Sequence, residues 1–328
     1  MSFKAPMATR PDAGISTRLV DLDEQDLMPG EALVAVDHSS VNYKDAIALA
    51  GAIEVVRTFP LIPGIDLAGT VLESSYPGVL VGDRVVVDSW SLGQTHHGGH
   101  AQRARVKGEW LVKIPEPLST RDAMAIGTAG YAAMLSVLAL EHNGLTPARG
   151  NVLVTGANGG LGSIAISLLA ELGYRVVAST GRLAQAHRLR ELGAAEVLDR
   201  RALSEPGPPI GEERRAGAVD TAGSHTLANV LAQTRYRGAV AAHGLTQGID
   251  LPGSVLPFIL RHVTLAGTDS VHAPRDVRLQ AWSRSARNLD LGKLARATRL
   301  IGLAQVPEAV GDILSGIVRG RLVVDVNA

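Results

Sequence analysis

One stretch, residues 151–172, constrains the fold more than any other part of the sequence. It begins with Asn151 to Val154, which are mostly apolar and β-prone and indicate a buried strand. Glycines follow at positions 156, 159, 160 and 162. The residues from Ser163 to Leu172 are apolar on all sides, which indicates a helix packed on a sheet. The stretch therefore predicts a strand, a tight glycine turn and a helix in direct succession.

This succession of elements is typical of a dinucleotide-binding site. Turn glycines let the backbone approach a pyrophosphate closely, and the helix N-terminus offers that anion free N–H groups and a positive dipole end. The usual G-x-G-x-x-G pattern is altered, because Ala157 stands at the first glycine position, after Gly156. The alternative is a turn that binds nothing, and the strand and helix on either side argue against it. The expected cofactor contacts here are Gly156, Asn158, Gly159, Gly160, Leu161 and Gly162, with Gly244 and Leu245 after a later strand.

The next strand indicates which dinucleotide binds. Tyr174 to Ala178 form it, and an acid that would hold the ribose hydroxyls of NAD is expected about 20 residues after the loop. The chain instead has Ser179, Thr180, Gly181 and Arg182. Arg200, after a third strand at Glu196 to Leu198, adds a second positive charge. These residues favour the 2′-phosphate of NADPH; the alternative is that both arginines are solvated surface residues.

Composition excludes several classes of protein. The formal net charge of the 328 residues is zero, so nothing indicates nucleic acid or an acidic membrane surface as a partner. The absence of cysteine excludes disulfides, thiolate zinc sites and a cysteine nucleophile. No leader and no apolar run of ~20 residues is recognised, so we expect a cytoplasmic protein.

The order of elements predicts an α/β protein of two domains. Residues 1–118 are β-rich, are punctuated by glycine and proline, and contain one clear helix at Tyr43 to Ala50. Residues 119–269 begin with a helix capped by Ser119 and then alternate strands with helices, which predicts a doubly wound parallel sheet. Residues 270–328 end in an apolar strand from Gly320 that returns to the first domain. The substrate and the nicotinamide are expected between the two domains.

The sequence resembles the medium-chain dehydrogenase/reductase superfamily, and within it the YhdH/YhfP-type quinone oxidoreductases. The resemblance covers essentially the full chain and is carried by residues 39–45, 59–69, 105–111, 127–131, 156–162 and 256–261. It implies a GroES-like catalytic domain and a Rossmann domain. It also implies a homodimer joined through residues 263–271. The subfamily includes NADPH-dependent acryloyl-CoA reductases. The sequence departs from it in the proline-rich segment 206–215 and at the C-terminus.

The same resemblance argues against a metal. Zinc members of the superfamily have a cysteine where this chain has Asn42, and a His-Glu pair where it has Ile65 and Asp66. Asn42 is a poor zinc ligand and Ile65 cannot bind zinc. His96, His97 and His100 form a tempting cluster, but two glycines within it favour a polar loop over a rigid ligand set. We therefore expect a zinc-independent enzyme.

Without metal or thiol, the cofactor must carry the reaction. An activated C=C bond or a quinone accepts hydride without a Lewis acid, because the negative charge spreads onto oxygen. Asn42 is expected to orient the substrate or the nicotinamide ribose. Tyr43 is expected to donate a hydrogen bond, or a proton to the enolate carbon; the alternative is an aromatic packing residue whose hydroxyl contacts the cofactor. Thr128 should lie near the nicotinamide by family analogy, the alternative being a hydrogen bond to backbone at a helix break.

Three functions follow in order of preference. The first is reduction of an acryloyl-CoA-like enoyl thioester by NADPH, and the second is reduction of a quinone. The third, of another class, is a sensor that binds NADPH without catalysis.

Overall fold

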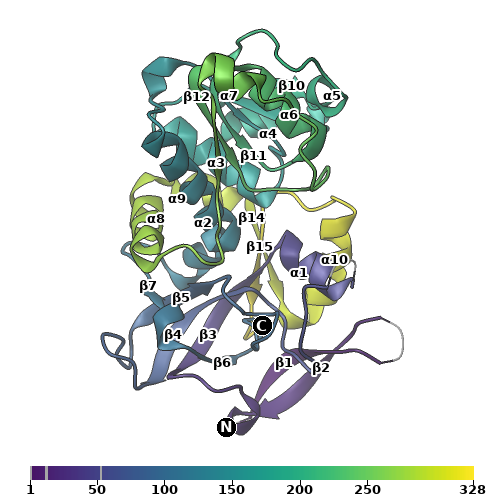
Figure 1. Cartoon of the computed structure of the whole chain (residues 1–328). Coiled ribbons are helices and arrows are strands. Elements are labelled where there is room, and N and C mark those ends of the chain that lie inside the picture. Colours follow the sequence, from purple (N-terminus) through teal and green to yellow (C-terminus); the bar gives the residue numbers. More distant parts are fainter. Residues whose placement is uncertain (1, 12–13, 52–53) are drawn as a thin grey trace. The chain divides into compact units, whose positions relative to one another are not determined.

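The computed structural model describes residues 2–11, 14–51 and 54–328, which form two compact units (Figure 1). Unit 1 consists of Met1–Thr128 and Leu294–Ala328, and unit 2 of Ala129–Lys293. The sequence placed the divisions at 118/119 and 269/270 instead. Residues 270–293 group with unit 2 because α8 (Arg275–Asn288) packs against α3 (Gly160–Glu171) and Lys293 pairs with Glu171.

Unit 2 is built on a six-stranded parallel sheet with the order β10-β9-β8-β11-β12-β13. This is the order of a Rossmann fold, in which the order of the strands along the sheet reverses between β8 and β11. Its strands are β8 (Val152–Val154), β9 (Val176–Thr180), β10 (Ala194–Asp199), β11 (Arg215–Asp220), β12 (Thr234–Ala242) and β13 (Thr264–Gly267). Its helices, besides α3 and α8, are α4 (Ala186–Glu191), α5 (Arg201–Ser204), α6 (Ser224–Ala232) and α7 (Leu256–Arg261).

The predicted sheet of unit 2 is confirmed, with strand boundaries that differ by a few residues. Its strands bury both faces, as parallel strands covered by helices do. Every residue of β8, β9 and β11 is buried. The helix after the glycine turn buries each residue from Gly162 to Leu169, which explains why its sequence is apolar all round. Side chains from the sheet and from α6 share one core that contains Leu153, Val177 and Val230.

Unit 1 contains a mixed sheet with the order β14-β15-β3-β4-β5-β7, while β6 also pairs with β3 (Figure 1). Strands β1 (Ser2–Thr9) and β2 (Ser16–Asp23) form a separate antiparallel hairpin. The sheet strands are β3 (Ala32–Val41), β4 (Asp66–Ser74), β5 (Arg84–Asp88), β6 (Arg103–Val106), β7 (Val112–Lys113), β14 (Thr298–Gly302) and β15 (Arg321–Asp325).

Two helices cover the core of unit 1. They are α1 (Tyr43–Leu49) and α10 (Val306–Leu314), which contact each other and share an apolar cluster with β3, β4 and β15. The C-terminal strand was predicted to return to the first domain, and β15 does so by pairing antiparallel with β3. This return brings residues from both ends of the chain into one sheet.

Helix α2 (Thr120–His142) begins after Ser119, as predicted. Ser119 and Asp122 exchange hydrogen bonds at its first turn. The helix is broken at Gly127, whose φ of 49° and ψ of −163° are not helical. In the described part of the chain it is the one helix long and apolar enough to cross a membrane, but most of it is buried in the protein. Helix α9 (Leu291–Arg296) completes the set of α-helices described here.

Candidate functional site

The glycine turn of unit 2 lies at the point where the strand order reverses. Gly156 has a φ of 58°, and a Cβ there would lie 2.1 Å from Thr221 Oγ1. Gly159 N donates to Gly156 O at 2.9 Å, which closes the turn before α3 begins at Gly160. A Cβ on Gly162 would lie 2.4 Å from Gly156 O. The turn thus requires glycine at positions 156 and 162, and the backbone N–H groups of the first turn of α3 are left for a ligand.

A buried acid supports this turn, and sequence reasoning missed it. Asp220, at the end of β11, accepts hydrogen bonds from Thr155 Oγ1 and from Gly223 N, both at 2.8 Å. Burial raises the pKa of its carboxyl group. Thr155 in turn accepts from Thr221 N and so holds Thr221 against Gly156. The only signal in the sequence was an acid at the carboxyl end of an apolar strand.

The residues predicted to bind the adenosine end gather at the carboxyl ends of β9 and β10. Thr180 Oγ1 accepts hydrogen bonds from Asn158 Nδ2 at 2.7 Å and from Arg182 N at 3.0 Å, so it organises the turn from within. Arg200 N donates to Thr180 O, and the Arg200 side chain lies so close to Gly181 that a Cβ there would be 2.7 Å from Nε. Ser179 is buried beside them.

Arg182 and Arg200 are both exposed, and no carboxylate within the described ranges forms an ion pair with either of them. The two guanidinium groups lie at neighbouring strand ends, and Asp199 is the carboxylate that interacts electrostatically with Arg200. Gly244 lies at the same edge of the sheet, because a Cβ on it would be 2.0 Å from Thr221 O. Leu245 follows it and is 47% exposed.

Unit 1 contains a buried polar cluster, which we define as Ser40, Asn42, Asp45, Asp66 and Arg321. All five side chains are buried. Arg321 Nη1 donates to Asn42 Oδ1 at 3.0 Å, Nη2 donates to Ser40 Oγ at 2.7 Å, and Nε donates to Ala125 O at 2.9 Å. Ser40 Oγ lies 2.9 Å from both oxygens of the Asp66 carboxylate. The cluster thus links β3, β4, β15 and α2.

The charges in this cluster do not cancel, because two acids face one guanidinium. Asp45 accepts from Asn42 N at 2.8 Å and from Ile65 N at 2.9 Å. Burial, with the neighbouring Asp66 charge as a second cause, raises the pKa of Asp45 to about 7. Burial also raises the pKa of Asp66, and Arg321 opposes that shift. Burial thus favours the protonated form of both acids, and Arg321 favours the ionised form of Asp66.

The three residues predicted to be catalytic, Asn42, Tyr43 and Thr128, differ in exposure: Asn42 and Thr128 are buried, and Tyr43 is exposed. Asn42 is buried, and its amide nitrogen lies 3.0 Å from Asp66 Oδ2 and 3.3 Å from Asp45 Oδ2. Its side chain is thus engaged within the protein. Tyr43, the first residue of α1, is 46% exposed. Thr128 follows the helix break; its N–H donates to Asp66 Oδ2 at 2.9 Å, and its hydroxyl lies 3.3 Å from that of Ser89.

The buried polar cluster does not suit a zinc ion. Zinc requires donors such as imidazole, thiolate or carboxylate in a fixed set. Asn42 Oδ1 already accepts from Arg321, and that guanidinium would repel a second cation beside Asp66. Across residues 2–11, 14–51 and 54–328, no group of three potential histidine, cysteine or acidic ligands lies together.

The three histidines of the loop are used as polar packing groups. His96 Nε2 lies 3.2 Å from Pro29 O, and its ring meets Trp110 edge to face. His97 Nδ1 accepts from Ile62 N at 3.2 Å. His100 is fully buried, with Nδ1 2.9 Å from Ser39 Oγ. His100 therefore contacts Ser39, which is the residue next to Ser40 of the buried polar cluster.

We expect His100 to make the fold sensitive to acid. Burial lowers its pKa from 6.5 to about 4. The folded protein resists protonation of His100, so the stability that neutral His100 contributes is fully present above pH 6.5. As pH falls towards 4, the free energy of unfolding should decrease by about 3 kcal/mol at most. His100→Asn keeps a polar group opposite Ser39 and should lose less stability than the native chain over this window. Denaturant midpoints from pH 7 to 4.5 test this.

The control for this prediction is His187→Asn, because His187 lies exposed in α4. It should follow the native pH profile. Asp45 changes stability with pH in the opposite direction to His100. Because its pKa is raised, the protein loses stability as pH rises towards about 7. The informative quantity is therefore the difference between native and variant at each pH. A constant difference would contradict the role assigned to His100.

Comparisons with known proteins agree with both units. Residues 28–116 match the alcohol dehydrogenase GroES-like domain, and residues 160–287 match the zinc-binding dehydrogenase family. Acrylyl-CoA reductase AcuI of Ruegeria pomeroyi is 50% identical over 92% of this chain and 92% of its own. The putative quinone oxidoreductase YhfP of Bacillus subtilis is 43% identical over 98% of each chain.

Solved structures extend this likeness to the whole fold. The yhdH oxidoreductase from Salmonella enterica, in complex with NADP, has a TM-score of 0.97 and is 45% identical. The match covers 99% of this chain and 100% of that one. Bacillus subtilis yhfP, solved with NAD bound, has a TM-score of 0.96, is 42% identical and is covered to the same extent. The chain therefore belongs to the medium-chain dehydrogenase/reductase superfamily, in the family of oxidoreductases that includes AcuI, YhdH and YhfP.

Proposed function

We propose that this protein is a zinc-independent, NADPH-dependent reductase of an acryloyl-CoA-like enoyl thioester. The observation that supports the cofactor is the pair of exposed guanidinium groups, Arg182 and Arg200, at the carboxyl ends of β9 and β10. The name of the AcuI relative supports the substrate class. When bound, NADPH supplies the hydride, and the chain supplies position and hydrogen bonds.

The glycine turn is proposed to hold the pyrophosphate. Gly156 and Gly162 allow the turn to pack this tightly, and the first turn of α3 offers free N–H groups to the anion. Gly160 and Leu161 contribute such N–H groups. Asn158 is proposed to act through Thr180, to which it is hydrogen bonded.

Arg182→Ala should lower the preference for NADPH over NADH by about tenfold, which corresponds to the loss of one charge-assisted hydrogen bond. Arg200→Ala should act in the same direction. The measurement is kcat/KM with each cofactor. Arg214→Ala is the matched control, because Arg214 is exposed in the same unit but pairs with Glu212 at 2.8 Å. An unchanged ratio in both Arg182 and Arg200 variants would show that the phosphate binds elsewhere.

In unit 1, we propose that Thr128 and Tyr43 meet the reacting end of the cofactor and the substrate. Hydride transfer to an enoyl thioester places negative charge on the carbonyl oxygen, and hydroxyl donors stabilise it. Tyr43 has the exposure that this role needs. Asn42 is proposed not to contact the substrate, because its side-chain amide bonds Arg321, Asp66 and Asp45. Its proposed role is to hold these charged groups in place, including Asp66, which accepts from Thr128 N.

The decisive experiment compares acceptors. NADPH oxidation should be far faster with acryloyl-CoA than with 1,4-benzoquinone, and a chelator should leave the rate unchanged. A faster reaction with the quinone would favour the second function, which the name of YhfP supports. Tight NADPH binding without turnover of either acceptor would favour a sensor.

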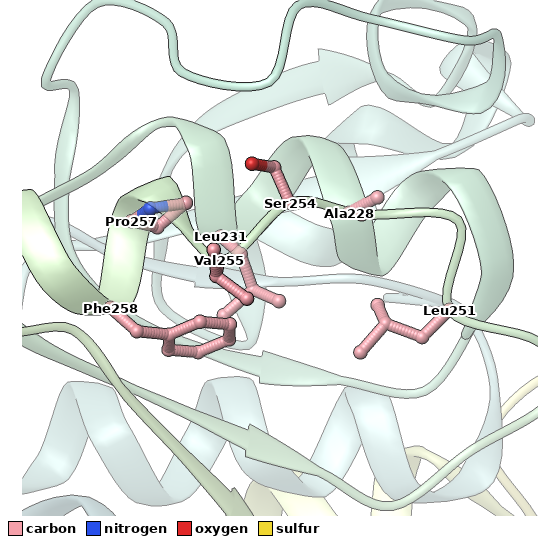
Figure 2. Close-up of a pocket in the computed structure, with 8 residues that line it drawn as sticks. Ala228, Leu231, Leu251, Ser254, Val255, Pro257 and Phe258 are labelled. Carbon is pink, nitrogen blue, oxygen red and sulfur yellow. The ribbon is translucent and has the colours of Figure 1, made fainter.

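We propose that the protein works in the cytoplasm as a homodimer joined along β13. That strand ends the sheet of unit 2, so one of its edges is unpaired in the described chain. Nearby α7 and the segment before it expose Val255, Ile259 and Leu260. An apolar pocket lies beside them, with Leu231, Val255 and Phe258 gathered on one side and Leu251 on the other (Figure 2). Sedimentation measures the oligomeric state, and a monomer at micromolar concentration would contradict the proposal.

A further inference from the structure

Two consecutive residues after β5 adopt a backbone conformation that side chains rarely tolerate. Ser89 has a φ of 63° and Trp90 a φ of 50°. Both are in the left-handed region, where a bulky residue such as tryptophan is strained. Such strain persists only where the surroundings impose it, and it concentrates at functional sites.

The surroundings do impose this conformation. The Trp90 ring stacks on Trp110, with centroids 6.2 Å apart and an angle of 13° between the planes. Ser89 N donates to Ile65 O at 2.7 Å, and Gln94 Nε2 donates to Trp90 O at 3.1 Å. The aromatic stack and these hydrogen bonds hold the turn from both sides. The effect is to fix where the Ser89 side chain points.

The Ser89 hydroxyl is directed at Thr128. Their oxygens are 3.3 Å apart, and within the described residues neither hydroxyl has another hydrogen-bond partner. Both residues are anchored to the same short segment, because Ser89 N donates to Ile65 O and Thr128 N donates to the carboxylate of Asp66. Both side chains are buried, but Thr128, at 9% exposed, lies less deeply than Ser89, at 1%.

We propose that Ser89 is a positioning residue that donates its hydroxyl proton to Thr128 Oγ1 and so leaves the Thr128 proton free for a substrate oxygen. A hydroxyl that accepts a hydrogen bond is a stronger donor, because chains of hydrogen bonds polarise one another. The left-handed turn is what aims Ser89 inward. This inference rests on the proposed role of Thr128 at the reacting end of the site.

A double-mutant cycle tests the proposal. Thr128→Val keeps the shape of the side chain and removes its hydroxyl. Ser89→Gly removes the hydroxyl of Ser89 and accepts a positive φ without strain. Each single variant should lower kcat/KM for acryloyl-CoA about tenfold, and Ser89→Gly should leave KM for NADPH unchanged. In the Thr128→Val background, Ser89→Gly should have no further effect, because its target is gone.

Stability separates a positioning role from a structural one. Ser89→Ala also removes the hydroxyl but keeps a Cβ at positive φ, so its Tm should lie below that of Ser89→Gly. Their activities should nevertheless be equally low. If Ser89→Gly lowers kcat/KM by the same factor in both backgrounds, or leaves it unchanged in the native one, the proposal is wrong. If Thr128→Val leaves turnover intact, the proposed function of Thr128 fails instead.

Discussion

Replacing Arg321 with methionine should lower the free energy of unfolding of unit 1 by about 3–5 kcal/mol, the cost of leaving a buried charge without its partner. Arg321 is buried and donates to Asn42, Ser40 and the backbone of α2. Methionine fills a similar volume but leaves the acids of the cluster without a cation. Urea unfolding measures the loss, and turnover should fall with it.

Two further variants make this result specific. Arg299→Met is the control, because Arg299 lies on the adjacent strand β14 and its exposed side chain forms an ion pair with Asp312 at 3.6 Å. It should change stability by less than about 1 kcal/mol. Adding Asp66→Asn to Arg321→Met should restore part of the loss, since one unpaired charge is removed. Equal effects of Arg321→Met and Arg299→Met would refute the charge argument.

Gly127→Ala should be almost as damaging, at about 3 kcal/mol or more. The φ of 49° and ψ of −163° at Gly127 belong to a region that only glycine enters readily. A Cβ there would also lie 2.5 Å from Arg321 Nη2 and 2.8 Å from both Asp66 Oδ2 and Ser40 Oγ. Alanine would therefore displace the buried polar cluster and the amide of Thr128. Thermal unfolding and NADPH oxidation measure the two consequences.

Gly311→Ala provides the matched control. Gly311 lies inside α10, and a Cβ there would meet nothing within 4 Å. Alanine should stabilise that helix by up to about 1 kcal/mol, because it loses less backbone freedom than glycine. Similar destabilisation by both substitutions would indicate a general intolerance of alanine rather than a requirement for glycine at position 127.

The sequence predicts unit 2 well because its signals are local. The glycine turn, the strand before it and the helix after it are contiguous, and each later strand is an apolar run between turn residues. The hydrogen bonds of Thr180 are an example of what the sequence does not predict. Its place after β9 could be predicted, but not that its hydroxyl would accept from Asn158 and from Arg182 N. Such pairings depend on how two strands come together.

Unit 1 was harder to predict because its site is assembled from distant segments. Arg321 was expected to be part of a returning strand, and its role depends on partners 279 and 281 residues away. Nothing in a single sequence links these positions. Ser89 was missed for another reason, since serine and tryptophan carry no signal for a left-handed turn. The helix break near Gly127 was expected, because glycine occurs twice in an apolar helical run.

The separation between Ser40 and Arg321 also bears on how the chain is made. During synthesis, Asp45 and Asp66 leave the ribosome first, then all of unit 2, and only then β15. Until that last strand pairs with β3, Asp45 and Asp66 lack their cation, and the apolar edge of β3 lacks its neighbour. Unit 2 can thus fold before the sheet of unit 1 is complete. A truncation before residue 321 should therefore yield a chain whose unit 1 is sensitive to proteolysis.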